Sequence, residues 1–190
     1  MLRTQLSRRL MSLVVLSSAA VAVAVAQEGQ PPEMPKPSPE HEQMAREAGE
    51  WNAEITLWHT PGDEPAKSKG TETNTMFGKF WMLSEFKSDF GGMEYTGRGQ
   101  FGYDPVAKKC VGTWIDTWTP FVQNMEGSYD EKTHTLTMTS KYYDMMAGKE
   151  VTGKNVTTYI DDNTKKFEMY APGPDGKEYK MMEVMYTRKK

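Results

Sequence analysis

The stretch from Met93 to Trp118 constrains the fold more than any other part of the chain. In residues 93–103, aromatic, methionine and glycine positions alternate with polar ones, which is the period of a half-buried strand. Asp104-Pro105 then reverses the chain, because Pro105 sets the φ that opens a turn and Asp104 can bond to the backbone two residues further on. Residues 109–118 return as the antiparallel partner. The segment therefore predicts a β-hairpin.

The same unit of strand, polar turn and strand recurs to the C-terminus. The strand-like runs cover residues 51–59, 69–77, 80–90, 93–103, 109–118, 121–129, 134–141, 151–160, 166–171 and 177–188. Each connection is short, so sequence neighbours pair with one another. An open meander of about ten strands would expose two edges. We therefore expect an all-β fold, a single antiparallel up-and-down barrel of about ten strands with one short N-terminal helix; a two-sheet β-sandwich is the alternative.

The N-terminus has the pattern of a secretory signal peptide. Three arginines precede an apolar run from Leu10 to Val25, and Ala24-Val25-Ala26 has the form of a cleavage site. The run of about 16 residues is shorter than the roughly 20 that span a bilayer. We expect cleavage after Ala26 rather than a membrane anchor, and hence export to the periplasm or outside a bacterial cell. Ser7-Arg8-Arg9 also resembles a twin-arginine export signal, so export by either the twin-arginine or the general secretory route is open.

Residues 27–38 are proline-rich and almost free of apolar side chains, so we expect a disordered tether. Ser38 before Pro39, acids in the next turn and Gly49 at the far end predict one helix from Pro39 to Ala48. The folded domain is then expected to cover residues 39–190.

Charge and cysteine content exclude several classes of partner. Of the 23 lysines and arginines, three lie in residues 1–26, which contain no acid; the remainder has 20 basic against 26 acidic residues, a formal net charge of −6. Nucleic acids and anionic membranes select basic surfaces, so neither is expected as a partner. Cys110 is the only cysteine, so no intramolecular disulfide can form, and we expect it to be a small buried hydrophobe.

Short motifs follow one another through the domain in a specific order. They are Pro39-Glu40-His41-Glu42, Gly49-Glu50-Trp51, Gly70-Thr71-Glu72-Thr73, Gly97-Arg98-Gly99, Gly102-Tyr103-Asp104-Pro105, Gly112-Thr113-Trp114-Ile115-Asp116, Pro172-Gly173-Pro174-Asp175-Gly176-Lys177, Met182-Glu183 and Tyr186-Thr187-Arg188-Lys189-Lys190. From about residue 39 to the end, this series resembles the DUF1579 family of bacterial proteins. The resemblance implies a small lipocalin-like barrel without an established function, and it carries no catalytic residues across. Gly49-x-Trp51 also resembles the lipocalin signature, in which the tryptophan closes the bottom of the barrel.

The strand faces expected to point inward are rich in aromatic residues and methionines interleaved with glycines. They contain Trp51, Tyr95, Phe101, Met125, Tyr129, Met138, Phe167 and Met169, with Gly97, Gly99 and Gly127 between the large groups. A barrel of this size is either filled by side chains or holds one small ligand, and the composition fits both.

The candidate ligand site comprises Tyr95, Gly97, Phe101, Trp114 and Asp116. In this hypothesis Trp114 forms a wall, Gly97 leaves a void against it, and Asp116 is the polar group that orients a ligand. The opposite face of the same strand is also apolar. If Val111, Thr113 and Ile115 point inward instead, Asp116 is a solvated surface carboxylate.

The sequence shows no recognisable catalytic, metal or cofactor motif. It has no Ser-His-Asp arrangement, nucleotide-binding glycine loop or metal-binding loop. His41, His59 and His134 lie far from one another and from Cys110, so no metal or cofactor is expected. His41 is expected in an exposed first helical turn. The methionines are expected to fill the core rather than bind copper.

Three functions remain open. The leading one is an exported, non-enzymatic barrel that binds a small apolar or amphipathic ligand. The second is a hydrolase or isomerase using a buried carboxylate such as Asp116, with Glu85, Glu183 and Gln123 as possible partners. The third is a structural or interaction module that acts through its outer face and has no cavity.

Overall fold

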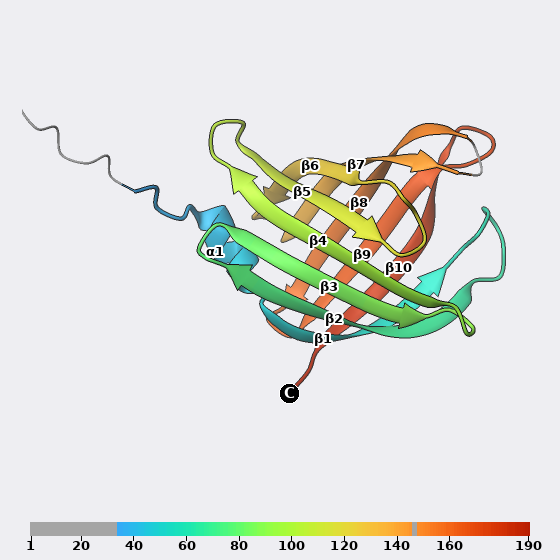
Figure 1. Cartoon of the computed structure of the whole chain (residues 1–190), viewed down its shortest axis with the longest axis horizontal. Coiled ribbons are helices and arrows are strands. Elements are labelled where there is room, and N and C mark those ends of the chain that lie inside the picture. Colours follow the sequence, from blue (N-terminus) through green and yellow to red (C-terminus); the bar gives the residue numbers. More distant parts are fainter. Residues whose placement is uncertain (1–33, 146–147) are drawn as a thin grey trace, which may run out of the picture. The chain divides into compact units, whose positions relative to one another are not determined.

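In the described part of the chain, ten antiparallel strands close into one barrel in which β1 (Gly49–Leu57) pairs with both β2 (Ala66–Phe77) and β10 (Glu178–Arg188) (Figure 1). The computed structural model describes residues 34–145 and 148–190. The expected signal peptide (1–26) and most of the expected tether lie outside the described residues. Closure confirms the predicted up-and-down barrel and excludes the two-sheet sandwich, because every strand has a partner on both edges.

The elements follow one another along the chain with short connections, as the turn pattern predicts. They are α1 (Pro39–Ala45), β1 (Gly49–Leu57), β2 (Ala66–Phe77), β3 (Trp81–Asp89), β4 (Glu94–Asp104), β5 (Lys109–Asp116), β6 (Gln123–Asp130), β7 (Thr135–Asp144), β8 (Lys149–Asp161), β9 (Thr164–Pro172) and β10 (Glu178–Arg188).

Period-2 alternation decides which side chains enter the barrel. On β3, Met82 and Phe86 are buried, whereas Trp81, Leu83 and Lys87 on the opposite face are exposed. The same alternation on β4 turns Gly97 inward and Arg98 outward. Because successive side chains of a strand point to opposite sides of the sheet, the apolar and polar alternation of a strand specifies which of its side chains enter the closed barrel.

Helix α1 lies against β3 and β4 and begins as the sequence predicts. It ends at Ala45 rather than Ala48, because the amides of Glu47 and Ala48 bond to the carbonyl groups of Met44 and Ala45, as in a tighter turn. The expectation of an exposed His41 was wrong. The residue is only 4% exposed, its ring packs edge-on against Phe80 and Tyr103, and its Nδ1 accepts a hydrogen bond from the Ser38 amide.

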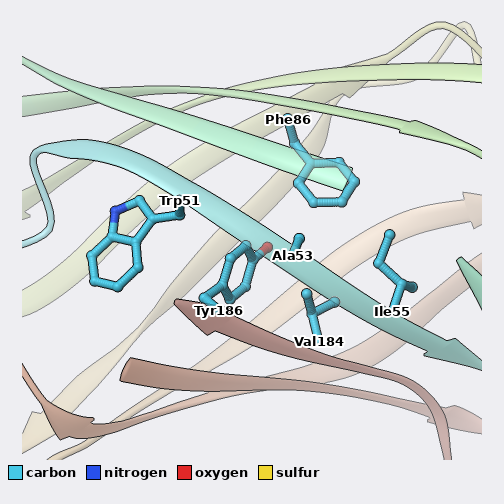
Figure 2. Packing of buried hydrophobic residues seen from close by; sticks show 6 residues of the cluster. All are labelled: Trp51, Ala53, Ile55, Phe86, Val184 and Tyr186. Atoms are coloured by element: carbon cyan, nitrogen blue, oxygen red, sulfur yellow. The ribbon is translucent and has the colours of Figure 1, made fainter. Parts of the chain in front are cut away.

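A compact apolar cluster joins β1, β3 and β10. Figure 2 shows its members, Trp51, Ala53, Ile55, Phe86, Val184 and Tyr186. Trp51 is fixed from two sides: its Nε1 donates to the Glu47 carbonyl oxygen at 2.9 Å, and the Arg188 guanidinium lies 4.2 Å from its ring centre. Arg188 also donates to the carbonyl oxygens of Ala48 and Arg46. These contacts link β10 to the residues that connect α1 with β1.

Candidate functional site

The barrel is hollow. A cavity of about 310 Å³ lies inside it, lined by α1 and by every strand except β1. This volume is at the lower end of the range for small-molecule pockets, roughly 300–1,000 Å³. Seven of the eight residues expected to face inward line the cavity, and the eighth, Trp51, is buried in the adjacent cluster.

Most of the lining is aromatic or thioether. Phe86, Phe90, Tyr95, Phe101 and Trp114 supply one wall, from β3, the following turn, β4 and β5. Methionines cover much of the rest, namely Met44, Met82, Met125, Met138, Met169 and Met182. Rigid rings beside flexible thioethers give an apolar surface that adapts to the shape of a guest.

Three of the five candidate site residues, Tyr95, Phe101 and Trp114, line this cavity. Trp114 Nε1 donates a hydrogen bond to the Tyr95 hydroxyl oxygen at 3.1 Å, which locks both rings in the wall. Burial raises the pKa of Tyr95 to about 12, and the nearby Asp116 charge acts in the same direction. Tyr95 is therefore a neutral phenol at physiological pH.

Gly97 does not leave the expected void. A Cβ atom placed on it would lie 2.2 Å from Cζ2 of Trp114, so the indole already occupies that space. Gly97 thus permits the close approach of Trp114 to β4. Trp114 lines the cavity, whereas Gly97 does not.

Asp116 has a different role from the one expected. Its Oδ1 accepts hydrogen bonds from the backbone amides of Trp118 at 2.9 Å and Thr119 at 2.8 Å, and the residue does not line the cavity. Its carboxylate therefore stabilises the turn that follows β5.

The other acids considered from the sequence point away from the interior. Glu85 pairs with Lys87 and Arg98, each at 2.6 Å, and its hydrogen bonds to these two residues lower its pKa. Glu183 pairs with Lys180 at 2.5 Å. Of the four residues proposed for an enzymatic cleft, only Gln123 lines the cavity.

The polar end of the cavity is instead built by Glu47, Glu72 and Lys165. The ammonium of Lys165 lies 2.6 Å from Glu47 Oε2 and 2.7 Å from Glu72 Oε1, and all three side chains are at most a tenth exposed. Lys165 Nζ also lies 4.9 Å from the ring centre of Trp51 and 4.8 Å from that of Tyr186. We call Glu47, Glu72 and Lys165 the charged triad.

Neutral side chains add further hydrogen bonds to the triad. Tyr159 donates to Glu47 Oε1 at 2.5 Å, Asn74 Nδ2 donates to Glu72 Oε1 at 2.8 Å, and the Tyr186 hydroxyl is hydrogen-bonded to Glu72. Burial lowers the pKa of Lys165, but the two carboxylates outweigh it and raise the pKa above its ordinary value. Burial and the neighbouring carboxylates raise the pKa of Tyr159 and of Tyr186. The lysine is therefore charged and both phenols are neutral.

Sequence reasoning missed the triad because its members carry little local signal. Glu47 lies in a turn after the helix, and Glu72 is flanked by polar residues on both faces of β2. Lys165 precedes the run expected as a strand, and it is followed by another lysine, so alternation does not single it out. Asn74, two residues after Glu72, lies on the same face of β2, but in a strand with polar residues on both faces this does not show which face is the inner one.

Cys110 lies in the lining near α1, and burial raises the pKa of its thiol, which fits the expectation of an inert buried cysteine. Within residues 34–145 and 148–190, no group of three or more histidine, cysteine, aspartate or glutamate side chains could hold a metal ion. None of the helices in this described part of the chain is long and apolar enough to cross a membrane.

Solved structures share this architecture at low sequence identity. The crystal structure of Rv2717c from M. tuberculosis matches with a TM-score of 0.59 and 9% identity over 82% of this chain and 100% of that one. The S-type phycobiliprotein lyase CPES from Guillardia theta matches with a TM-score of 0.56 and 10% identity over 80% and 93%. At such identities the likeness concerns the fold alone.

No sequence among the curated proteins matches the chain. The family match, in contrast, spans nearly the whole barrel: residues 36–188 fit the family described as "protein of unknown function (DUF1579)". The order of motifs in the sequence and the closed ten-strand barrel agree with that match. The chain belongs to the DUF1579 family.

Proposed function

We propose that the protein is exported and that it binds one small apolar or amphipathic molecule inside the barrel, without catalysing a reaction. The cavity is the main observation that supports this proposal. Most of its lining is aromatic or thioether, and the charged triad supplies convergent polar groups. A large apolar lining with a few convergent polar groups is what a small-molecule site requires.

Two observations favour binding over the alternatives. An interaction module acting through its outer face was expected to have no cavity, and a cavity is present. An enzyme based on Asp116 would need that carboxylate inside a cleft, but it bonds to the backbone of a turn. In the proposed role, Tyr95, Phe101 and Trp114 contact the apolar body of the ligand.

Export is supported by the N-terminal arginines, apolar run and Ala-x-Ala pattern of residues 1–26. If the signal is cleaved as proposed, mass spectrometry of protein recovered from the periplasm or medium of the expressing bacterium should show an N-terminus at Gln27. Intact protein retained in the cytoplasm would contradict export.

Titration with N-phenyl-1-naphthylamine, a neutral apolar fluorophore, tests binding. We expect a saturable rise in fluorescence with one site per chain. Ser84→Leu adds bulk to a buried residue of the cavity lining and should weaken binding by about tenfold or more. Ser128→Leu makes the same change at an exposed position on β6 and should leave binding unchanged. Absence of saturable binding, or equal binding by the Ser84→Leu variant, would overturn the proposal.

A further inference from the structure

The polar end of the cavity has more hydrogen-bond acceptors than donors. The donors of Lys165, Tyr159 and Tyr186 are directed at the two carboxylates of the triad or at ring faces. Each carboxylate offers about four acceptor positions, so acceptor capacity remains after these bonds are made. A ligand whose polar group is a hydrogen-bond acceptor would therefore find no free donor on these three side chains.

The formal charges of the cavity lining also favour a ligand that donates hydrogen bonds. Four lining residues carry formal charge, three of them glutamates, namely Glu40, Glu47 and Glu72, against the single ammonium of Lys165. A hydrogen bond from Ser38 lowers the pKa of Glu40, which keeps it a carboxylate. The buried triad alone has two glutamates and one lysine, a formal net charge of −1. Such a charge attracts a cation and repels an anion.

Among the described residues, two buried carboxamides also have an unpaired oxygen, and one of them, Asn155, lines the cavity. Asn155 lies in the cavity lining on β8, and its Nδ2 donates to the Met125 sulfur at 3.3 Å, while its Oδ1 has no partner among the described residues. Asn74 donates to Glu72, and its own Oδ1 also has no partner within the described chain. Unmet buried acceptors are costly, so each of them favours a donor nearby.

From these contacts we infer that the ligand is a cationic amphiphile, an organic ammonium on an apolar body, whose charged head lies at the Glu47–Lys165–Glu72 end. This inference rests on the proposed binding function and adds the chemical class of the guest. The ammonium supplies N–H donors to carboxylates that are already positioned, and the body lies against Phe101 and Trp114. Fatty acids and other carboxylates are expected to be excluded.

Three probes with the same ring system test the inference by displacing N-phenyl-1-naphthylamine. At neutral pH, 2-naphthylmethylamine is a cation, 2-naphthylmethanol is neutral and 2-naphthoate is an anion. Because hydrogen bonds between charged groups are the strong ones, we expect the amine to bind about tenfold or more tighter than the alcohol, and the carboxylate to bind weakest. The three probes occupy nearly the same volume, so the order reports the head group.

Glu47→Gln removes one negative charge and nearly preserves shape. It should abolish most of the preference for the amine over the alcohol, measured as the ratio of their affinities within that variant. Glu126→Gln is the matched control, because Glu126 is exposed on the outer face of β6 and pairs with Lys109. If Glu47→Gln does not fold, the order of the three probes on the unmodified protein decides the question.

The possible outcomes separate the inference from the proposed function. If the fluorophore binds but the alcohol or the carboxylate competes as well as the amine, the cavity binds ligands and the inferred charge class is wrong. An amine preference that persists in Glu47→Gln, with that variant folded, also overturns the inference. If neither the fluorophore nor any of the three probes binds, the binding function itself fails.

Discussion

Lys165 is the residue on which the interior electrostatics depend. Removing two carboxylates and an ammonium from water costs several kcal/mol for each ion, and the cost is offset only when the ions contact each other and their remaining positions are hydrogen-bonded. In this barrel Lys165 contacts both acids within 2.7 Å, and Tyr159 and Asn74 occupy further positions on them. The two carboxylates are compatible with a buried site because the lysine lies between them.

Substitution of this lysine should therefore be severe. Lys165→Met keeps most of the side-chain volume but leaves two buried acids without their cation, and we expect it to lower the free energy of unfolding by about 3–5 kcal/mol. Lys166→Met is the matched control on the outward face of the same strand, where the lysine is one third exposed and pairs with Glu168 at 3.2 Å. It should cost about 1 kcal/mol or less. Urea denaturation compares the two variants, and equal losses would show that the triad does not stabilise the fold.

At the scale of elements, β4 and β5 pack through glycine and tryptophan rather than through two large side chains. Gly99 pairs with Trp114 and Gly97 with Asp116, and the indole lies over both glycines. The arrangement places the ring of Trp114 flat on β4, where its Nε1 reaches the Tyr95 hydroxyl. Strand glycines thus set the position of the aromatic wall of the cavity.

Gly97→Ala tests this packing. The new methyl group would overlap Cζ2 of Trp114, so the ring must move into the cavity, and overpacking of this kind costs typically about 1–3 kcal/mol. We expect lower stability in urea, a changed tryptophan emission spectrum and weaker binding of N-phenyl-1-naphthylamine. Gln100→Ala, at an exposed position on the same strand, should change none of these. Unaltered stability and emission of Gly97→Ala would mean that the ring does not depend on the glycine.

At the scale of the whole molecule, closure buries several groups that resist losing a proton. Burial raises the pKa of Tyr95, Tyr159 and Tyr186, and the adjacent carboxylates add to the effect at Tyr159 and Tyr186. The carboxylates of the triad raise the pKa of Lys165 against the opposing effect of burial. In the unfolded chain all four groups titrate near their ordinary values of 10.0 for tyrosine and 10.5 for lysine.

Alkaline pH should therefore unfold the barrel. Above about pH 10 the unfolded chain binds fewer protons than the folded one, so stability falls as pH rises. The stabilisation that comes from these raised pKa values is fully present below about pH 10. Above that pH, each tyrosine that stays protonated only in the folded state lowers the free energy of unfolding by about 1.4 kcal/mol per pH unit. Urea midpoints measured across this range should be flat at first and then fall, and the fall should be shallower in Tyr186→Phe. A midpoint that does not change at high pH would contradict the buried assignment of these groups.

The sequence by itself determined most of the strands and their order, and it favoured a closed barrel over a sandwich. These properties depend on local signals: the period-2 alternation of Met93 to Tyr103, the Asp104-Pro105 turn and connections too short for any but neighbouring strands to pair. The same alternation placed Tyr95 and Phe101 on the inner face, where the structure has them lining the cavity. It did not determine whether the interior was filled, because that depends on the summed volumes of side chains from all strands.

Only the tertiary structure decided which polar groups meet inside. Glu47 and Glu72 lie 118 and 93 residues from Lys165 in the sequence, and β9 brings the lysine to both of them. Asp116, which looked like an interior carboxylate, lies where the chain leaves β5, and two backbone amides of the next turn bind it. Alternation specifies the face of a residue, but a contact between side chains also depends on the register of every strand between them and on the closure that brings both ends of the sheet together.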